Sequence, residues 1–184
     1  MKKIIEGNKI NLRFLKLSDA KSIHKYAKDP LISRTTFVPY PYTLKHARSF
    51  IRKSQIAARK GKWYAYGIEK KSSPEIIGII GIHGVNKKNK RADLGYWLGK
   101  KFWGGGMVSE AVELVVKACF LNLKLNRITS CVLPGNPAST KILKKNGFIE
   151  EGILRKQIFK GNRWQDIYLY GLLREDFKKK KFRK

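Results

Sequence analysis

The sequence predicts a single-domain α/β protein with a mixed, mostly antiparallel sheet of about seven strands and helices on both faces. Three observations support this fold class. Segments with apolar residues at every second position, as in half-buried strands, alternate with segments of helical spacing. Three consecutive strand segments near the middle favour an antiparallel meander. A strongly apolar helix then lies between two further strands, where a sheet is needed to cover it.

The N-terminal part begins with a strand and a short helix. Residues 8–14 alternate between apolar and polar side chains, which indicates a half-buried strand. Ser18 is expected to cap a helix over 19–26, which ends before Pro30 because the residue preceding a proline avoids helical backbone. Residues 32–42 combine aromatic residues with prolines and are expected to be irregular. They form either a wall of a substrate site or an ordinary packed loop.

A longer helix leads into the meander. Thr43 is expected to cap this helix, whose apolar positions keep close to helical spacing until it ends near Gly61. The three strands that follow span residues 63–69, 76–85 and 91–98. Residues 87–90 form the turn between the last two, so neighbouring strands should pair antiparallel.

The C-terminal part alternates helices and strands. Its helices are expected at 107–121, which is apolar on most sides, and at 136–147. Asn136 caps the second helix with Pro137 in its first turn, and Gly147 ends it. The strands are expected at 127–133, 148–159 and 164–173, the last two as a hairpin that turns at 160–162.

Composition and termini bound the organisation of the chain. No linker rich in glycine, serine or proline divides the 184 residues, so we expect one domain over residues 1–177 and a basic tail over 178–184. The N-terminus lacks a signal-peptide core and no run of ~18 apolar residues occurs, which predicts a cytoplasmic protein without membrane contact. Cys119 and Cys131 lack metal-ligand or redox spacing, so neither a metal nor a disulfide is expected.

The charge of the chain is extreme. Its 41 Lys and Arg residues against 13 Asp and Glu residues give a formal net charge of +28. Such a charge attracts polyanions, of which ribosomal RNA is one. The alternative is a surface rich in lysine with no specific polyanionic partner.

Three consecutive glycines, Gly104, Gly105 and Gly106, stand where the strand at 91–98 leads into the apolar helix. Glycine permits positive φ and close approach of a ligand, and the first N–H groups of a helix attract anions. A nucleotide-binding P-loop is excluded because Met107 and Val108 stand where a Lys-Ser/Thr pair is required. A dinucleotide-binding fingerprint is short of one glycine and would open the first βα unit. A tight turn without a ligand is the remaining alternative.

The pattern Lys101-x-x-Gly104-x-Gly106 resembles the coenzyme A pyrophosphate loop of the GCN5-related N-acetyltransferases (GNATs), which usually have Arg or Gln at the position of Lys101. The run from Gly95 to Gly104, followed by Ser-Glu-Ala at 109–111, resembles the RimJ/RimL branch, which acetylates protein N-terminal amines. The resemblance implies the single-domain GNAT fold and acetyl-CoA as cosubstrate.

A second stretch, from Asn136 to Phe148, resembles the motif in which Asn and Ser precede a helix that closes with Gly-Phe. The two motifs together imply the residues that bind acetyl-CoA. These are Trp97, Leu98, Lys101, Gly104, Gly105, Gly106, Met107, Val108, Asn136 and Ser139.

The resemblance also implies catalytic roles. Leu143 stands where many relatives outside this branch have the tyrosine that protonates the departing thiolate. In the RimJ/RimL branch a serine at the position of Ser139 takes this role, and a purely helix-capping serine is the alternative. A backbone N–H of the strand before the glycine loop, here near Leu98, is implied as the donor to the carbonyl oxygen of the thioester.

The base that accepts the amine proton is not given by the motifs. A ribosomal-protein acetyltransferase of this branch uses a glutamate that aligns with Ile158, which cannot accept a proton. The remaining carboxylates near the expected cleft are Asp93 and Asp166. Asp93 stands where related sequences often have glutamate and is the catalytic candidate, with a structural role as the alternative. His83 on the neighbouring strand fits a satisfied core histidine better than a base.

The function implied by these residues is acetyl transfer from acetyl-CoA to a primary amine, in the first place the N-terminal α-amine of a protein or ribosomal protein. One alternative acceptor is a small molecule, namely a polyamine, an aminoglycoside or an amino acid. Another alternative is a non-catalytic module on the same fold that binds RNA or the ribosome through its positive charge. Ribosome or other polyanion association is also expected of the enzyme.

Overall fold

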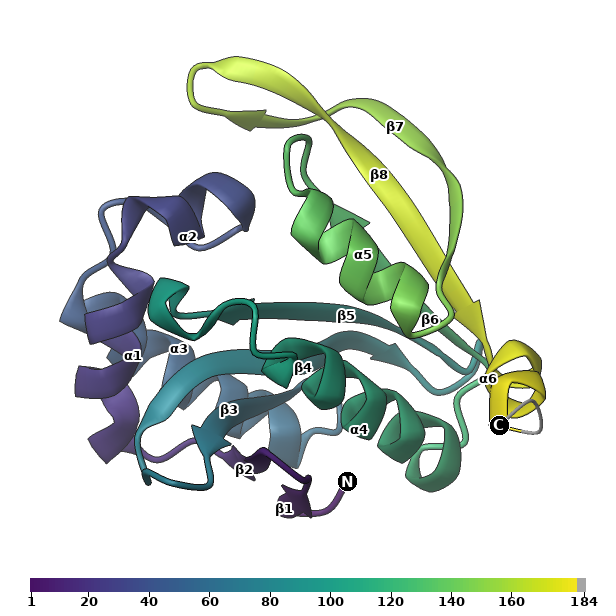
Figure 1. Cartoon of the computed structure of the whole chain (residues 1–184), viewed down its shortest axis with the longest axis horizontal. Coiled ribbons are helices and arrows are strands. Elements are labelled where there is room, and N and C mark those ends of the chain that lie inside the picture. Colours follow the sequence, from purple (N-terminus) through teal and green to yellow (C-terminus); the bar gives the residue numbers. More distant parts are fainter. Residues whose placement is uncertain (182–184) are drawn as a thin grey trace.

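One eight-stranded sheet organises the protein, in the order β1-β2-β3-β4-β5-β6-β8-β7. The computed structural model describes residues 1–181, with side chains through residue 177 (Figure 1). The strands are β1 (Ile4–Glu6), β2 (Ile10–Phe14), β3 (Tyr64–Lys70), β4 (Ile76–Asn86), β5 (Arg91–Leu98), β6 (Arg127–Val132), β7 (Ile149–Lys160) and β8 (Arg163–Leu173). Every neighbouring pair is antiparallel except β5 and β6, which are parallel.

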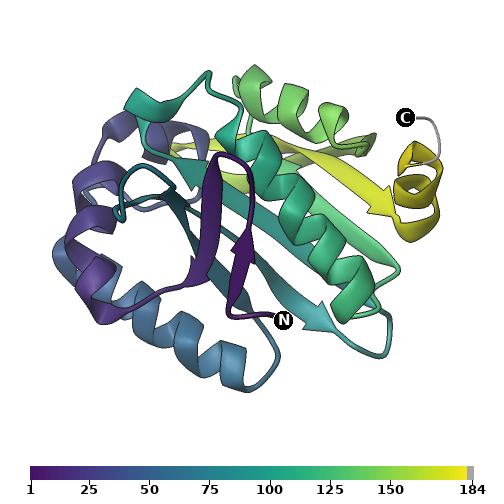
Figure 2. The ribbon, with the colours of Figure 1, turned by 60° about the horizontal axis from the view of Figure 1, so that its bottom comes forward.

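Helices cover both faces of this sheet. They are α1 (Ala20–Ala27), α2 (Pro30–Thr35), α3 (Leu44–Arg59), α4 (Met107–Asn122), α5 (Pro137–Lys145) and α6 (Arg174–Lys181). Helices α1 and α3 pack together and against β4 and β3, whereas α4 packs with α5 and against β2, β4 and β5 (Figures 1 and 2). The inward side of α4 is fully buried through Ala111, Val112 and Val115, as its apolar sequence predicts. The predicted α/β class with a mixed, mostly antiparallel sheet is confirmed.

Several local expectations need correction. Ser18 does not cap α1, because a short 3-10 turn over Leu17–Asp19 precedes the helix and Asp19 occupies the cap position. Residues 32–42 are not wholly irregular, since α2 reaches Thr35; Asp29 accepts a hydrogen bond from the Leu31 N–H, and Pro30 starts the helix as its first residue. The short strand β1 brings the strand count to eight.

The part of the chain that the structure describes ends with a helix. Helix α6 runs to Lys181, across the boundary expected after residue 177. Residues 182–184 of the expected tail lie outside the described residues.

Strands β5 and β6 pair over only part of their length. The register runs from Arg91 opposite Arg127 to Leu94 opposite Ser130. Beyond Leu94, β5 continues along β4 to Leu98, whereas β6 stays paired with β8 to Val132. The two central strands therefore separate, and backbone groups of the second half of β5 lose a partner on that edge.

Candidate active site

The glycine loop presents a helix start without a side-chain cap. Gly106 is the N-cap of α4 with φ of 76°, and Gly104 has φ of 81°, so both use a backbone region that favours glycine. The first intrahelical acceptor is the Gly106 carbonyl, which receives the Glu110 N–H at 3.1 Å. The N–H groups of the first turn are thus open to a ligand. A Cβ built at Gly104 would meet no atom within 4 Å, so the loop leaves open space beside these donors.

A cation that the sequence did not reveal reaches this loop. The Lys9 Nζ donates to the Gly105 carbonyl at 3.0 Å and lies 3.8 Å from the Cβ position of Gly106. Glu110, in the first turn of α4, accepts hydrogen bonds from the backbone N–H groups of Asn8 and Lys9. The β1–β2 turn is thereby held at the start of α4 (Figure 2). The only sequence signal for this contact is the first-turn position of Glu110.

Lys101, in the short turn before the glycines, lies against two aromatic rings. Its Nζ is 5.1 Å from the ring centre of Tyr26 and 4.8 Å from that of Phe102. These contacts place its charge beside α1 and over two aromatic rings. The loop with its open donors, its two left-handed glycines and these flanking cations fits a pyrophosphate group.

Leu98 offers its backbone to the space where β5 leaves β6. The Gly99 N–H donates to the Ile77 carbonyl of β4 at 2.9 Å. Because successive residues of a strand point their N–H and C=O groups to opposite edges, the groups of Leu98 face away from β4. Its carbonyl accepts the Trp103 Nε1–H at 2.7 Å, which fixes the end of the strand. Its N–H points to the same edge, where a thioester carbonyl requires a donor.

Ser139 meets a second hydroxyl that sequence analysis missed. The Asn136 side chain caps α5 by accepting the Ser139 N–H at 3.1 Å, and its amide donates to the Thr35 carbonyl of α2 at 3.0 Å. The Ser139 Oγ lies 2.8 Å from the Tyr96 hydroxyl of β5. Burial raises the pKa of Tyr96 to about 12, so Tyr96 stays protonated near neutral pH and can donate to Ser139. Leu143 is fully buried, as expected of a core residue.

Asp93 lies on the face of β5 opposite to Tyr96, because side chains alternate along a strand. Its carboxylate accepts the Thr129 hydroxyl from β6, and one oxygen is 4.0 Å from the His83 Nδ1 of β4. The expectation that His83 is a core histidine is wrong, since 57% of its side chain is exposed. Asp166 accepts the Lys156 N–H and stabilises the β7–β8 hairpin.

A hollow of about 520 Å³ lies between α2 with the connection after it and the tip of the β7–β8 hairpin. Phe37 and Tyr40 line one side, and Ile158 and Phe159 the other. The Lys160 Nζ donates to the Ser33 and Thr36 carbonyls and ties the two sides together. Burial lowers the pKa of Lys160. The residues proposed as a wall of a substrate site thus do line a hollow.

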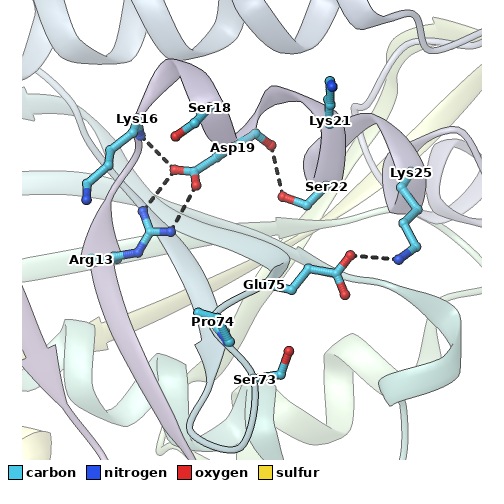
Figure 3. A pocket seen from close by; sticks show the side chains of 10 residues that line it. All are labelled: Arg13, Lys16, Ser18, Asp19, Lys21, Ser22, Lys25, Ser73, Pro74 and Glu75. Carbon is cyan, nitrogen blue, oxygen red and sulfur yellow. Dashed lines mark hydrogen bonds and ion pairs between the residues drawn. The ribbon is translucent and has the colours of Figure 1, made fainter.

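A second hollow, of about 550 Å³, lies between α1, the end of β2 and the loop before β4 (Figure 3). Ion pairs stand on its two sides. Arg13 binds Asp19 at 2.9 Å, and Lys25 binds Glu75 at 2.7 Å. Arg13 also binds Glu69 of β3 at 2.9 Å. This hollow shares no lining residue with the glycine loop or with Ser139, and its pairs hold α1 to the sheet.

Two kinds of feature are absent from the part of the chain that the structure describes. No cluster of three or more His, Cys, Asp or Glu side chains is arranged there to hold a metal ion. No helix in this part of the chain combines the length and apolar character needed to cross a membrane.

A helix start shaped for an anion, beside a strand that leaves its parallel neighbour, defines an acyl-transfer site fed by a phosphate-bearing carrier. Residues 9–149 match the family described as Acetyltransferase (GNAT) domain. The chain therefore belongs to the GNAT family, and it is an acetyl-CoA-dependent N-acetyltransferase.

Individual relatives support this assignment. The chain is 33% identical over 170 residues to the uncharacterized N-acetyltransferase p20 of Bacillus licheniformis, which covers 92% of this chain and 95% of the relative. It is 32% identical over 96 residues to the ribosomal-protein-serine acetyltransferase of Escherichia coli, with 52% and 54% covered. The structure of RimL, a ribosomal L7/L12 alpha-N-protein acetyltransferase in complex with coenzyme A, has a TM-score of 0.84 at 19% identity, over 92% of this chain and 97% of that chain.

Proposed function

We propose that this N-acetyltransferase modifies the N-terminal α-amine of a protein, in particular of a ribosomal protein. The observation that carries the proposal is the composition of the hollow between α2 and the β7–β8 hairpin. Its charged lining residues are Arg34 and Lys160, and none of its lining residues is acidic. A polyamine or an aminoglycoside carries several positive charges, so a site that binds it needs carboxylates. A peptide N-terminus carries only one positive charge. The similarity of about half of the chain to the Escherichia coli enzyme supports the same acceptor class.

Acetyl-CoA supplies the activated acetyl thioester. The N–H groups of Gly104, Gly105, Gly106, Met107 and Val108 bind its pyrophosphate, because the loop geometry and the helix dipole converge there. Lys9, bonded to the Gly105 carbonyl, and Lys101, in the preceding turn, add positive charge near the loop. Trp97 and Leu98, on β5 beyond its last pair with β6, and Asn136 and Ser139, at the start of α5, are proposed to position the thioester.

Two groups of the chain act on the reacting atoms, and the charge of a third favours loss of the amine proton. The Leu98 N–H donates to the carbonyl oxygen as negative charge develops on it. Ser139 donates a proton to the departing thiolate sulfur and is held in place by the Tyr96 hydroxyl. Asp93 lies on the opposite face of β5, beside the last residue pair before the strands separate, and its charge favours removal of the amine proton.

An acceptor screen with detection of the released thiol tests this function. N-terminal peptides, polyamines, aminoglycosides and free amino acids are compared at equal concentration. We expect the highest kcat/KM with peptides. A polyamine or an aminoglycoside that exceeds every peptide contradicts the proposed acceptor. Binding of acetyl-CoA without thiol release for any acceptor would favour the non-catalytic module instead.

We further propose that the positive surface recruits the enzyme to ribosomes or another polyanion. A coenzyme A site needs only a few positive groups, whereas the formal net charge is +28. Association driven by phosphates weakens with salt by a log–log slope of about −0.7 per single-strand phosphate neutralised. Co-sedimentation with ribosomes across a salt series should show this slope for the full chain, and a weaker slope for a chain that ends at Phe177. Absence of co-sedimentation at low salt contradicts recruitment.

A further inference from the structure

Three polar side chains stand in a row across the three central strands, on the face of β5 opposite to Tyr96. They are His83 of β4, Asp93 of β5 and Thr129 of β6. Thr129 donates its hydroxyl hydrogen to one oxygen of Asp93, and the other oxygen lies 4.0 Å from the His83 Nδ1. Central strands of a sheet covered on both faces are ordinarily apolar, yet 57% of the His83 side chain and 45% of the Asp93 side chain are exposed. An open polar row at this place requires an explanation.

Two glycines shape the surroundings of this row. Gly84 has φ of 59° and lies at an irregularity of the β4–β5 pairing, and a Cβ built there would be 2.9 Å from the Asp93 Oδ2. Only glycine allows the backbone so close to the carboxylate. A Cβ at Gly95 would be 3.8 Å from the His83 Nε2. Because Gly95 has no side chain, the Nε2 faces an open position.

That open position borders the separation of the strands. Gly95 is the first residue of β5 beyond the last pair with β6, which joins Leu94 and Ser130. An amine that approaches over Gly95 can enter between the strands from the face opposite to Ser139. The imidazole then has its Nδ1 toward Asp93 and its Nε2 toward the amine.

We infer that His83 is the general base of the reaction, and that Asp93 and Thr129 are positioning residues that act through it. This inference rests on the proposed function. The new N–C bond forms as the C–S bond breaks, the electron pair of that bond leaves with the sulfur, and the amine proton moves to the His83 Nε2. His83 then releases this proton to solvent, to which it is exposed.

The base strength of imidazole favours this division of roles. Imidazole ordinarily titrates near 6.5 and a carboxylate near 4, whereas an α-amino group titrates near 8. Transfer of the proton to imidazole is therefore more than about a hundredfold more favourable than transfer to a carboxylate. The carboxylate, 4.0 Å from the Nδ1, serves better by stabilising the imidazolium through its negative charge.

Charged groups of the neighbouring strands face His83 or Asp93. Asp93 faces His83 from β5. Arg127 of β6, paired with Glu151 of β7, interacts with Asp93 in turn. The β3–β4 pairing ends with Tyr64 and Ile82, one residue before His83. The negative charge of Asp93 stabilises positive charge that forms on the imidazole, so its removal should shift the low-pH limb of the activity profile to lower pH.

The first experiment compares pH profiles of kcat at saturating acceptor and acetyl-CoA. Wild type should lose activity at low pH, with an apparent pKa that stays the same for two peptides whose amines differ in pKa. His83→Gln should lower kcat by about 10²-fold or more and remove this limb. Asp93→Asn should lower kcat less and move the limb to lower pH. His24→Gln, on α1, is the matched control and should behave as wild type.

The second experiment distinguishes catalysis from structure. The exposed site should admit free imidazole, which we expect to restore activity to His83→Ala in proportion to its concentration. Acetyl-CoA should stabilise His83→Gln against heat as it does wild type. If His83→Gln keeps both its rate and its low-pH limb, the inference is wrong. A wild type that binds acetyl-CoA but acetylates no amine contradicts the proposed function itself.

Discussion

The two faces of β5 form their parts of the site in different ways. On the side of α4 and α5, the groups proposed to bind acetyl-CoA are mostly backbone N–H groups within one short stretch, from Leu98 to Val108. On the opposite side, His83, Asp93 and Thr129 come from three strands. The hollow is likewise built from distant segments, α2 and a hairpin more than a hundred residues later. A site made of local backbone depends on few substitutable side chains, whereas a site made of distant side chains can change its acceptor while the fold is kept.

The largest effect that can test this contrast is loss of acetyl-CoA binding to the backbone N–H groups of the glycine loop. Gly106→Val should reduce acetyl-CoA affinity by more than about 10²-fold, because the side chain enters the space beside the N–H donors and strains a positive φ. The nearest described atom to a Cβ there is the Lys9 Nζ at 3.8 Å, so the fold should persist. Thermal unfolding with acetyl-CoA at 100 times Kd should show about 2.7 kcal/mol of stabilisation for wild type and little for the variant.

Gly161→Val provides the matched control for this change. Gly161 has φ of 60° and no atom within 4 Å of its Cβ position, so it has the same strain without a ligand site for acetyl-CoA. It should bind acetyl-CoA as wild type does. Equal acetyl-CoA affinity of a folded Gly106→Val variant would show that the loop is not the pyrophosphate site.

The next effect concerns the proton that reaches the thiolate. Ser139→Ala should lower kcat by about 10²–10⁴-fold with little change in acetyl-CoA affinity. Tyr96→Phe removes only the hydrogen bond to Ser139, worth about 1 kcal/mol, so kcat should fall by up to about tenfold. Stopped-flow measurement of a single turnover separates chemistry from product release. Unchanged single-turnover rates in both variants would assign Ser139 to helix capping alone.

The same contrast explains what the sequence could predict. The glycine loop, the apolar α4 and the cap at Asn136 are local signals, and the structure has all three where they were expected. The fold class followed from these signals and from the order of the strands. The short strand β1 has three residues, too few for an alternating pattern to be recognised.

The remaining site residues could not be found in this way. Tyr96 and Ser139 are 43 positions apart, and Lys9 and Gly105 are 96 apart, so their contacts depend on the register of the sheet and on helix docking. His83 was misjudged because the seven residues before it in β4 are all buried, and the sequence does not show that the strand becomes exposed at His83 and Gly84. Sites made of side chains from distant segments can be recognised only once the three-dimensional packing is known.

A smaller effect, on the alkylation rate of a cysteine, tests whether the ligand binds where β5 and β6 separate. Cys131 of β6 is exposed, whereas Cys119 is buried, so alkylation should modify Cys131 alone in the folded chain. Burial and the charge of Asp93 raise the pKa of the Cys131 thiol, so labelling should be slow at neutral pH and faster as pH rises. Saturating coenzyme A should slow labelling, by up to about a hundredfold at 100 times Kd.

Two variants calibrate this measurement. Cys131→Ser should remove the label, and Asp93→Asn should speed labelling because it removes a negative charge near the thiol. Mass spectrometry identifies the modified peptide. A labelling rate that saturating coenzyme A leaves unchanged would place the ligand away from the separation of β5 and β6.

The smallest effect tests how the acceptor side is held together. The Lys160 Nζ donates to two carbonyls at the end of α2, and it is the tie between the hairpin and the connection after α2. Lys160→Met keeps the length of the side chain but removes these donors, so the hollow should widen and the acceptor KM should rise several-fold, at a cost of about 1 kcal/mol in the free energy of unfolding.

Lys88→Met, in the exposed turn between β4 and β5, is the matched control. Acceptor titration and urea unfolding measure the two quantities. Because the glycine loop lies on other elements, acetyl-CoA affinity should not change. If Lys160→Met lowers the affinity for acetyl-CoA as much as the affinity for the acceptor, the acetyl-CoA site and the acceptor site are coupled.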